Sequence, residues 1–217
     1  MKLVGGTHVG MVRAKNEDTY RCGKLADGTA WALVCDGMGG VHGGQLASSI
    51  AADMVSDKIK KCYNPAMSVS SLENLLLSAV TTANVLVFDR GDLDISLKGM
   101  GTTIVAAIIK DNEACIAHVG DSRAYIIENN KIRQVTRDHS LVQEMYDSGK
   151  ITFEEMETHP QKNIITRAMG VGEEVEIDFD YVCINDNEAL ILCSDGLSGL
   201  ISEKRMLEIY KNSSFEE

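Results

Sequence analysis

Proline is scarce in this sequence, since only Pro65 and Pro160 occur among 217 residues. No stretch combines serine, glycine and proline in the way that flexible linkers do, and no segment is repeated. The sequence therefore marks no internal domain boundary, and we expect one domain over residues 1–217. A chain of that length can bury a sizeable hydrophobic core.

Excess positive charge is also missing, because 21 Lys and Arg stand against 32 Asp and Glu and the net charge is −11. A strongly acidic protein is repelled by a phosphate backbone, so nucleic acid is not expected as a partner. No apolar run approaches the ~20 residues of a membrane span, and the first residues lack the apolar core of a secretory signal. The sequence predicts a cytoplasmic protein without a membrane partner.

The six cysteines form no C-x-x-C pair and no cluster with histidine. Such spacing favours neither a disulfide framework nor a zinc site. Cys35, Cys115 and Cys193 lie within apolar runs, and we interpret them as small core residues.

The spacing of apolar residues predicts strands, then two long helices, then strands again. We expect strands at residues 3–8, 18–22, 29–35, 102–110, 113–119, 123–128, 132–135, 175–184 and 188–193, and helices at 44–62, 70–91, 141–148 and 202–210. Capping boxes are indicated at Ser70-x-x-Glu73 and Thr152-x-x-Glu155. This order is typical of an α+β fold with antiparallel sheets and not of a doubly wound fold.

Two apolar runs end in a carboxylate followed by glycine, at Asp36-Gly37 and at Asp195-Gly196. A strand directs its last side chain with little freedom, and glycine lets the backbone come close to a ligand. Carboxylate oxygens are the ligands that hard divalent cations prefer. We therefore expect the two corners to meet at one metal site. The alternative for each corner is a glycine-rich turn with a solvated aspartate.

Other polar segments allow both a functional and a structural interpretation. Arg13, Glu17 and Asp18 lie within six residues of one another, where the guanidinium could hold a phosphate or the group could form an exposed, charged turn. Asp121 follows an apolar run, and it could be a further oxygen ligand or part of an Asx-turn.

Two further segments carry polar side chains that could act in chemistry or in helix capping. Residues 136–140 are expected to form a loop leading into a helix, with Asp138, His139 or Ser140 as its cap. His42 is a candidate proton donor, and its alternative is an ordinary polar residue of a glycine-rich loop.

Seven segments, in this order, resemble the metal-dependent protein phosphatase family, protein phosphatase 2C, in its bacterial form. The matching segments are V-R-x-x-N-E-D (12–18), C-D-G-M-G-G (35–40), M-G-T-T (100–103), H-V-G-D-S-R-A-Y (118–125), T-R-D-H-S-L-V (136–142), N-I-I-T-R-A-M-G (163–170) and S-D-G-L (194–197). Each segment is a weak signal alone, but their order along essentially the whole chain is very specific.

The resemblance implies a β-sandwich of two antiparallel sheets flanked by helix pairs, forming a single catalytic domain. It implies hydrolysis of phosphoserine and phosphothreonine in proteins by a water that bridges two metal ions. The implied partners are phosphorylated proteins, and serine/threonine kinases are the functional counterpart.

The resemblance also implies two Mn²⁺ or Mg²⁺ ions, with room for a third, weaker one. Asp36 would bridge the two ions, and the Gly37 carbonyl would bind one of them. Asp195 would hold the first ion and could share the third with Asp121.

The remaining residues implied by the resemblance act on water and on the substrate. Asp18, with or without Glu17, would orient a water bound to the metal, and Arg13 would hold the substrate phosphate. Residues 141–159 match a variable flap that lies beside the site and affects substrate choice.

The sequence departs from the family pattern in two places. The histidine that usually follows the glycines comes one position late, at His42, and Met38 stands where other members have a histidine. The family's last Asp-Asn segment and its final strand are not found before Glu217. We therefore expect a C-terminally truncated domain with weaker metal binding at the first site and an unpaired sheet edge. The alternative function is a catalytically impaired relative that binds phosphoproteins or regulates them.

Overall fold

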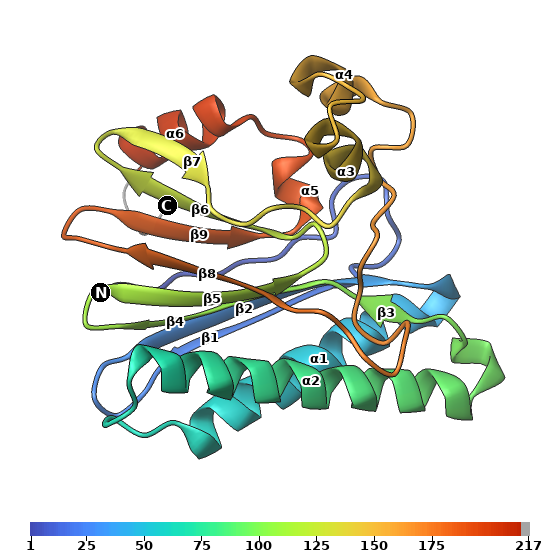
Figure 1. Ribbon diagram of the computed structural model, residues 1–217, viewed down its shortest axis with the longest axis horizontal. Helices are drawn as coiled ribbons and strands as arrows, with labels where there is room; N and C mark the ends of the chain where they lie inside the picture. The colour runs from blue at the N-terminus through green and yellow to red at the C-terminus, as the bar shows by residue number, and fades with distance from the viewer. Residues whose placement is uncertain (214–217) are drawn as a thin grey trace.

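Two antiparallel sheets face each other in the computed structural model, which describes residues 1–213 apart from the side chains of residues 40–42. The larger sheet has the order β1 (Asp18–Lys24), β2 (Ala30–Met38), β4 (Ile104–Lys110), β5 (Glu113–Val119) and β8 (Asp178–Cys183), with β3 (Gly101–Thr102) paired to β2. The smaller sheet has the order β7 (Lys131–Gln134), β6 (Arg123–Glu128) and β9 (Ala189–Cys193). The predicted α+β sandwich is confirmed (Figure 1).

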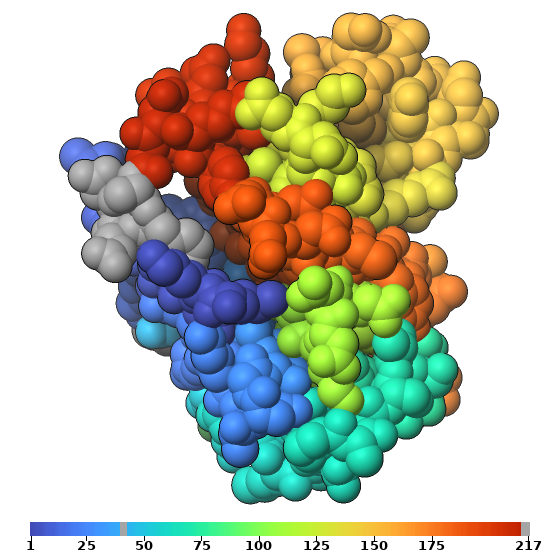
Figure 2. All heavy atoms as spheres, turned by 90° about the vertical axis from the view of Figure 1, so that its left-hand side faces the viewer, coloured from blue at the N-terminus to red at the C-terminus, as the bar shows by residue number. Residues whose placement is uncertain are grey.

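Helices cover both outer faces of the sandwich. The larger sheet is covered by α1 (Gly40–Cys62) and α2 (Val69–Leu93), and the smaller sheet by α6 (Glu203–Asn212) (Figure 1). A short 3-10 helix, η1 (Ile95–Leu97), follows α2. The remaining helices are α3 (Leu141–Asp147), α4 (Phe153–Thr158) and α5 (Asp195–Ser198). Figure 2 shows the α1–α2 layer at the bottom and the α3–α4 segment projecting in gold at the top.

The central strand β4 packs into two hydrophobic cores because its side chains alternate between the faces of the sheet. Ile104, Ala106 and Ile108 belong to the core against α1 and α2. Val105 and Ala107 belong to the core between the two sheets. Burying a side chain of the size of Ile stabilises the folded state by about 1.5–3 kcal/mol. Because β4 buries side chains on both faces, it stabilises the packing of the sheet against the helices and against the second sheet.

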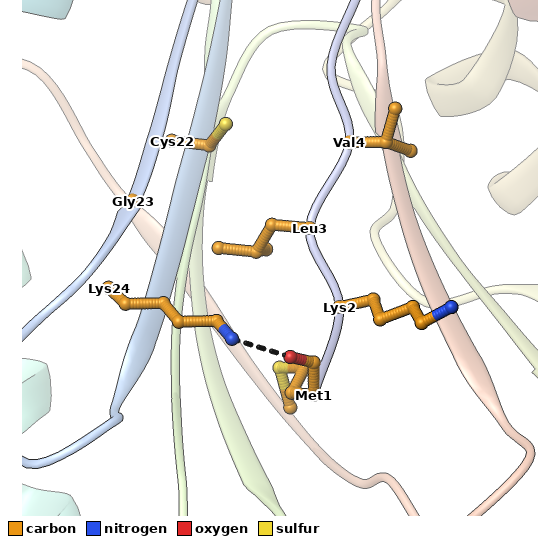
Figure 3. Close-up of a pocket in the computed structure, with 7 residues that line it drawn as sticks. All are labelled: Met1, Lys2, Leu3, Val4, Cys22, Gly23 and Lys24. Atoms are coloured by element: carbon orange, nitrogen blue, oxygen red, sulfur yellow. Dashed lines mark hydrogen bonds between the residues drawn. The ribbon is translucent and has the colours of Figure 1, made fainter. Parts of the chain in front are cut away.

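The strand predicted at residues 3–8 is wrong, because the N-terminal segment has no regular ladder partner among the described residues. A strand exists only when a neighbour accepts and donates its backbone hydrogen bonds. The segment is held instead by single bonds, in which Tyr20 Oη donates to the Gly5 carbonyl over 3.2 Å and Lys24 Nζ to the Met1 carbonyl over 2.7 Å. Figure 3 shows the shallow pocket between this segment and β1, which is lined by Met1, Lys2, Leu3, Val4, Cys22, Gly23 and Lys24.

Of the two capping boxes predicted from the sequence, one is found in the structure and one is not. The capping box of Thr152 and Glu155 is confirmed at the start of α4. The box predicted at Ser70 is wrong, since α2 begins two residues earlier, where the Ser68 side chain accepts from the Ser71 amide. Ser68, Ser70 and Ser71 all lie near the start of this helix, and sequence alone does not distinguish which of them takes the cap position.

The helix α2 is long and apolar enough to cross a membrane by length and composition, although the sequence suggested no such run. Nearly half of its most apolar stretch is buried inside the protein. Its buried residues pack in the same core as α1 and β4, and they are Leu72, Leu75, Leu76, Ala79, Val80, Ala83 and Val87. Core packing therefore accounts for the apolar residues on the buried face of this helix.

Candidate metal centre

Three aspartates from both sheets converge at one end of the sandwich, where β3 and α5 lie in Figure 1. Asp18 and Asp36 are direct partners in the β1–β2 register, so their side chains lie on the same face. Asp195 is the first residue of α5 and follows β9 by two positions. The Ser194 hydroxyl donates to Asp18 Oδ2 over 2.7 Å and joins the two sheets at this point. The predicted meeting of Asp36 and Asp195 is confirmed.

The carboxylates strongly disfavour one another's charge. Burial, followed by the charges of Asp18, Asp195 and Asp121, raises the pKa of Asp36 to about 9. Burial, followed by the charge of Asp195, raises the pKa of Asp121 to about 6. Asp121 therefore belongs to the same cluster, in the turn between β5 and β6. A set of close, partly buried carboxylate oxygens fits a divalent cation such as Mg²⁺ or Mn²⁺.

The strand β2, expected at residues 29–35, does not stop before Asp36 but continues to Met38. Gly37 and Met38 extend it because they pair with β3. Thr103, just after β3, holds Asp36 on both backbone groups: its amide donates to the Asp36 carbonyl over 2.9 Å, and its Oγ1 accepts from the Asp36 amide over 3.0 Å. Thr102 Oγ1 donates to the same carbonyl over 2.9 Å. The sequence predicted a strand entry here and missed this support of the aspartate.

Gly37 is required by the close approach of two backbone segments. A Cβ atom at this position would lie 2.0 Å from the Gly44 carbonyl oxygen and 2.8 Å from the Glu17 carbonyl oxygen. The Gly37 amide donates to that Glu17 carbonyl over 3.2 Å. Glu17 is therefore locked between β2 and the beginning of α1, next to Asp18 and Asp36.

Two of the sequence candidates are not placed in the carboxylate cluster. Arg13 lies in an exposed loop before β1, and none of the contacts described for residues 1–213 joins it to the aspartates. The side chain of His42 lies outside the described part of the chain, so its assignment as a proton donor stays a prediction.

The segment 136–140 leads into α3 as predicted, and one of its three candidate caps is confirmed, but it also serves the site in a way that the sequence did not indicate. Ser140 is the cap of α3, since its side chain accepts from the Gln143 amide over 3.3 Å. Asp138 instead accepts from Arg123 Nη2 over 2.6 Å and from Arg123 Nε over 2.9 Å. Because Arg123 follows Asp121 by two residues, this pair anchors the turn that carries Asp121. In the sequence, the only sign of this ion pair is that Arg123 and Asp138 carry opposite charges. Their spacing does not show that they contact each other.

Comparisons with known proteins identify the family. A model of protein phosphatase 2C matches residues 6–216. The chain belongs to this family. Serine/threonine phosphatase stp of Listeria monocytogenes is 38% identical over 206 residues, which are 95% of this chain and 81% of that protein.

Solved structures agree with the family assignment. Serine/threonine phosphatase Stp1 from Staphylococcus aureus has a TM-score of 0.88 at 34% identity, and the match covers 95% of this chain and 81% of that one. The catalytic domain of the serine/threonine protein phosphatase PstP, crystallised in complex with two manganese ions, has a TM-score of 0.79 at 31% identity, covering 94% of this chain and 81% of that one. The prediction that this protein phosphatase 2C member is an enzyme of the serine/threonine phosphatase type is confirmed.

Proposed function

We propose that the protein hydrolyses phosphoserine and phosphothreonine in other proteins, and that it does so with Mn²⁺ or Mg²⁺ held at the aspartate cluster. The observation that carries this proposal is the convergence of Asp18, Asp36, Asp121 and Asp195, where the pKa of Asp36 is raised to about 9. Such mutual repulsion favours binding of divalent cations between the side chains. Relatives named serine/threonine phosphatases support the substrate class.

The residues have separate roles in this proposal. Asp36 would hold both ions and the Gly37 carbonyl would bind one of them, while Asp195 would hold the first ion and could share a weaker third one with Asp121. Two bound divalent cations lower the pKa of a water and neutralise charge on the phosphoryl oxygens. Asp18, whose Oδ2 accepts a hydrogen bond from the Ser194 hydroxyl, would accept another from that water.

Glu17 and Arg13 complete the proposed site. Glu17 would assist Asp18 in orienting water, because its backbone is fixed by the amide of Gly37. Arg13 would hold the substrate phosphate, since a planar guanidinium can donate two parallel hydrogen bonds to a phosphate. The exposure of Arg13 suits contact with a protein substrate at the surface. No covalent nucleophile is needed, because attack by water in line with the leaving oxygen suffices.

Partners and location follow from the substrate class. Phosphoproteins produced by serine/threonine kinases are the proposed substrates. All six cysteines are free, which suits a reducing compartment such as the cytoplasm. The alternative expected from the sequence, a catalytically impaired relative that binds or regulates phosphoproteins, is not supported, since all four clustered carboxylates are present and the relatives are named phosphatases.

The test is hydrolysis of a phosphothreonine peptide with and without Mn²⁺, compared between the wild type, Asp195→Asn and Asp53→Asn. Asp53→Asn is a matched control, because it removes the same charge from a residue that forms an exposed ion pair with Arg21. We expect turnover that needs Mn²⁺, is lost in Asp195→Asn and is retained in Asp53→Asn. Absence of turnover in the wild type, or turnover that survives in Asp195→Asn, would overturn the proposal.

A further inference from the structure

Both polar backbone groups of Gly120 are bound by one residue, His139. The His139 amide donates to the Gly120 carbonyl over 2.9 Å, and the Gly120 amide donates to His139 Nδ1 over 3.1 Å. Gly120 has a φ of 103°, and a Cβ there would lie 2.6 Å from Thr103 Cγ2. Glycine has no side chain to restrict its own backbone, so the two bonds from His139 determine how the chain enters Asp121.

The bond to Nδ1 specifies the tautomer of His139. Because Nδ1 accepts a hydrogen bond from the Gly120 amide, the proton of the neutral ring must be on Nε2. Nε2 lies 3.2 Å from Asp178 Oδ2, which can accept a hydrogen bond from the Nε2 proton. Arg167 Nη1 donates to the other oxygen of Asp178 over 2.9 Å and holds the carboxylate in place.

A second histidine supports the ring from one side. His118 stacks on His139 with 4.7 Å between ring centroids and an interplanar angle of 24°. Its Nε2 lies 2.9 Å from the Arg137 carbonyl, so it donates to the residue before Asp138. His118 is itself opposite Asp178 in the β5–β8 register. Contacts at both ring nitrogens therefore hold the His139 imidazole within its plane, and stacking on His118 holds one of its faces.

The same three side chains have the composition of a metal site, since ligand atoms of His118, His139 and Asp178 lie within 4.8 Å of one another. Among the described residues, His118 Nδ1 is also a buried nitrogen without a hydrogen-bond partner. Two contacts oppose a metal here. His139 Nε2 carries the proton and offers no lone pair, and the Arg167 guanidinium lies 3.4 Å from that nitrogen. A hydrogen-bond network accounts for the cluster better than a cation does.

We infer that His139 is a positioning residue of the phosphatase site: it fixes the Gly120–Asp121 backbone, and Asp178 fixes the tautomer that makes this possible. The inference rests on the proposed function, in which Asp121 is a ligand of the weakest cation. The segment 137–139 then holds the turn from both sides, through His139 on Gly120 and through Asp138 on Arg123.

Two substitutions of His139 separate its bonds. Asn places an oxygen where Nδ1 was and can still accept from the Gly120 amide, whereas Gln reaches the position of Nε2 and leaves that amide unpaired. His159→Asn is the matched control, because His159 Nδ1 also accepts a hydrogen bond from a backbone amide. That amide belongs to Gln161 and lies outside this turn. Thermal unfolding of each variant shows whether it has folded.

The first measurement uses metal-free protein and NMR. In the wild type we expect ¹⁵N shifts that place the His139 proton on Nε2, and slow exchange of the Gly120 amide. His139→Gln should speed that exchange on the order of 10-fold or more, while His139→Asn and His159→Asn should leave it near the wild-type rate. A proton on Nδ1, or equal exchange in folded His139→Gln, would overturn the inference.

The second measurement is calorimetric titration with Mn²⁺. We expect His139→Gln to weaken the weakest binding step by about 10-fold, as loss of a supporting bond near a ligand does, and Asp121→Asn to affect the same step. If Asp121→Asn changes no step, the proposed role of Asp121 fails, while the NMR result still decides the role of His139. Tight Zn²⁺ binding that persists in Asp36→Asn and disappears in His118→Gln would overturn the inference in favour of a second metal site.

Discussion

The Ser194 hydroxyl donates to Asp18 Oδ2 over 2.7 Å, although 176 residues separate the two in sequence. The bond links the residue after β9 to the first residue of β1, and so joins the two sheets at the aspartate cluster. It also fixes the Asp18 carboxylate beside Asp36 and Asp195. The site is thus assembled by tertiary structure and not by any local motif.

Asp36→Asn should make the metal-free protein more stable at neutral and alkaline pH. The pKa of Asp36 is raised from 3.8 to about 9, so the folded state binds this proton more tightly than the unfolded state. The stability that the proton contributes is complete below about pH 3.8 and is lost as the pH rises towards 9. Asparagine carries no proton to lose and no charge to repel its neighbours.

Thermal unfolding in EDTA between pH 5 and pH 9 checks this expectation. The Tm of the wild type should fall more steeply with rising pH than that of Asp36→Asn. At this chain length, each kcal/mol lost from the free energy of unfolding lowers the Tm by about 2–4 °C. Added Mn²⁺ should raise the Tm of the wild type and not that of the variant. Parallel pH profiles of the two proteins would contradict the raised pKa.

Arg13→Ala should lower kcat/KM for a phosphopeptide by roughly 10- to 100-fold, because a charge-assisted hydrogen bond to phosphate is lost. Arg13→Lys should keep part of the activity, since lysine supplies charge without the planar pair of donors. Arg133→Ala is the control, because Arg133 pairs with Glu128 on the β6–β7 hairpin. Equal kinetics for Arg13→Ala and the control would exclude Arg13 from phosphate binding.

Gly37→Ala should destabilise the protein by about 3 kcal/mol or more, since its Cβ would meet backbone atoms and not a flexible side chain. The nearest of these is the Gly44 carbonyl oxygen at 2.0 Å. Gly6→Ala has no atom within 4 Å of its new Cβ and should change stability by less than about 0.5 kcal/mol. Urea unfolding of both variants compares them directly, and equal midpoints would refute the predicted clash.

Asp138→Ala should cost about 2–3 kcal/mol, because it leaves the largely buried Arg123 guanidinium without its carboxylate. The cost stays below that of a fully buried pair because the Arg123 side chain is 28% exposed. Asp53→Ala breaks the exposed pair with Arg21 and should cost no more than about 1 kcal/mol. Chemical denaturation of the two variants measures the difference, and a loss at Asp138 no larger than at Asp53 would contradict it.

The sequence predicted those elements whose apolar pattern is complete within the element itself. The strands expected at 113–119 and 123–128 are found with the same bounds, because each is a short apolar run and the turn between them is a local signal. The meeting of Asp36 and Asp195 also followed from a pattern, a carboxylate and a glycine placed after an apolar run.

The missed features all depend on partners far away in sequence. The segment 3–8 has an extended, apolar pattern, but a pattern does not supply a neighbouring strand. Likewise, Thr103 and His139 act on the backbone of residues 67 and 19 positions away. Such contacts are fixed only when the sheets have packed, so no local rule identifies them.

The joining of the two sheets at the aspartates has a consequence for synthesis of the protein. Asp18 and Asp36 are already neighbours in the first hairpin, but Asp195 and Ser194 come only after β9. A chain still growing on the ribosome therefore carries an incomplete set of carboxylates until both sheets have been made and have docked. In the proposed function, dephosphorylation begins only once translation has passed β9 and the two sheets have docked, and shorter nascent chains leave the phosphoproteins around them untouched.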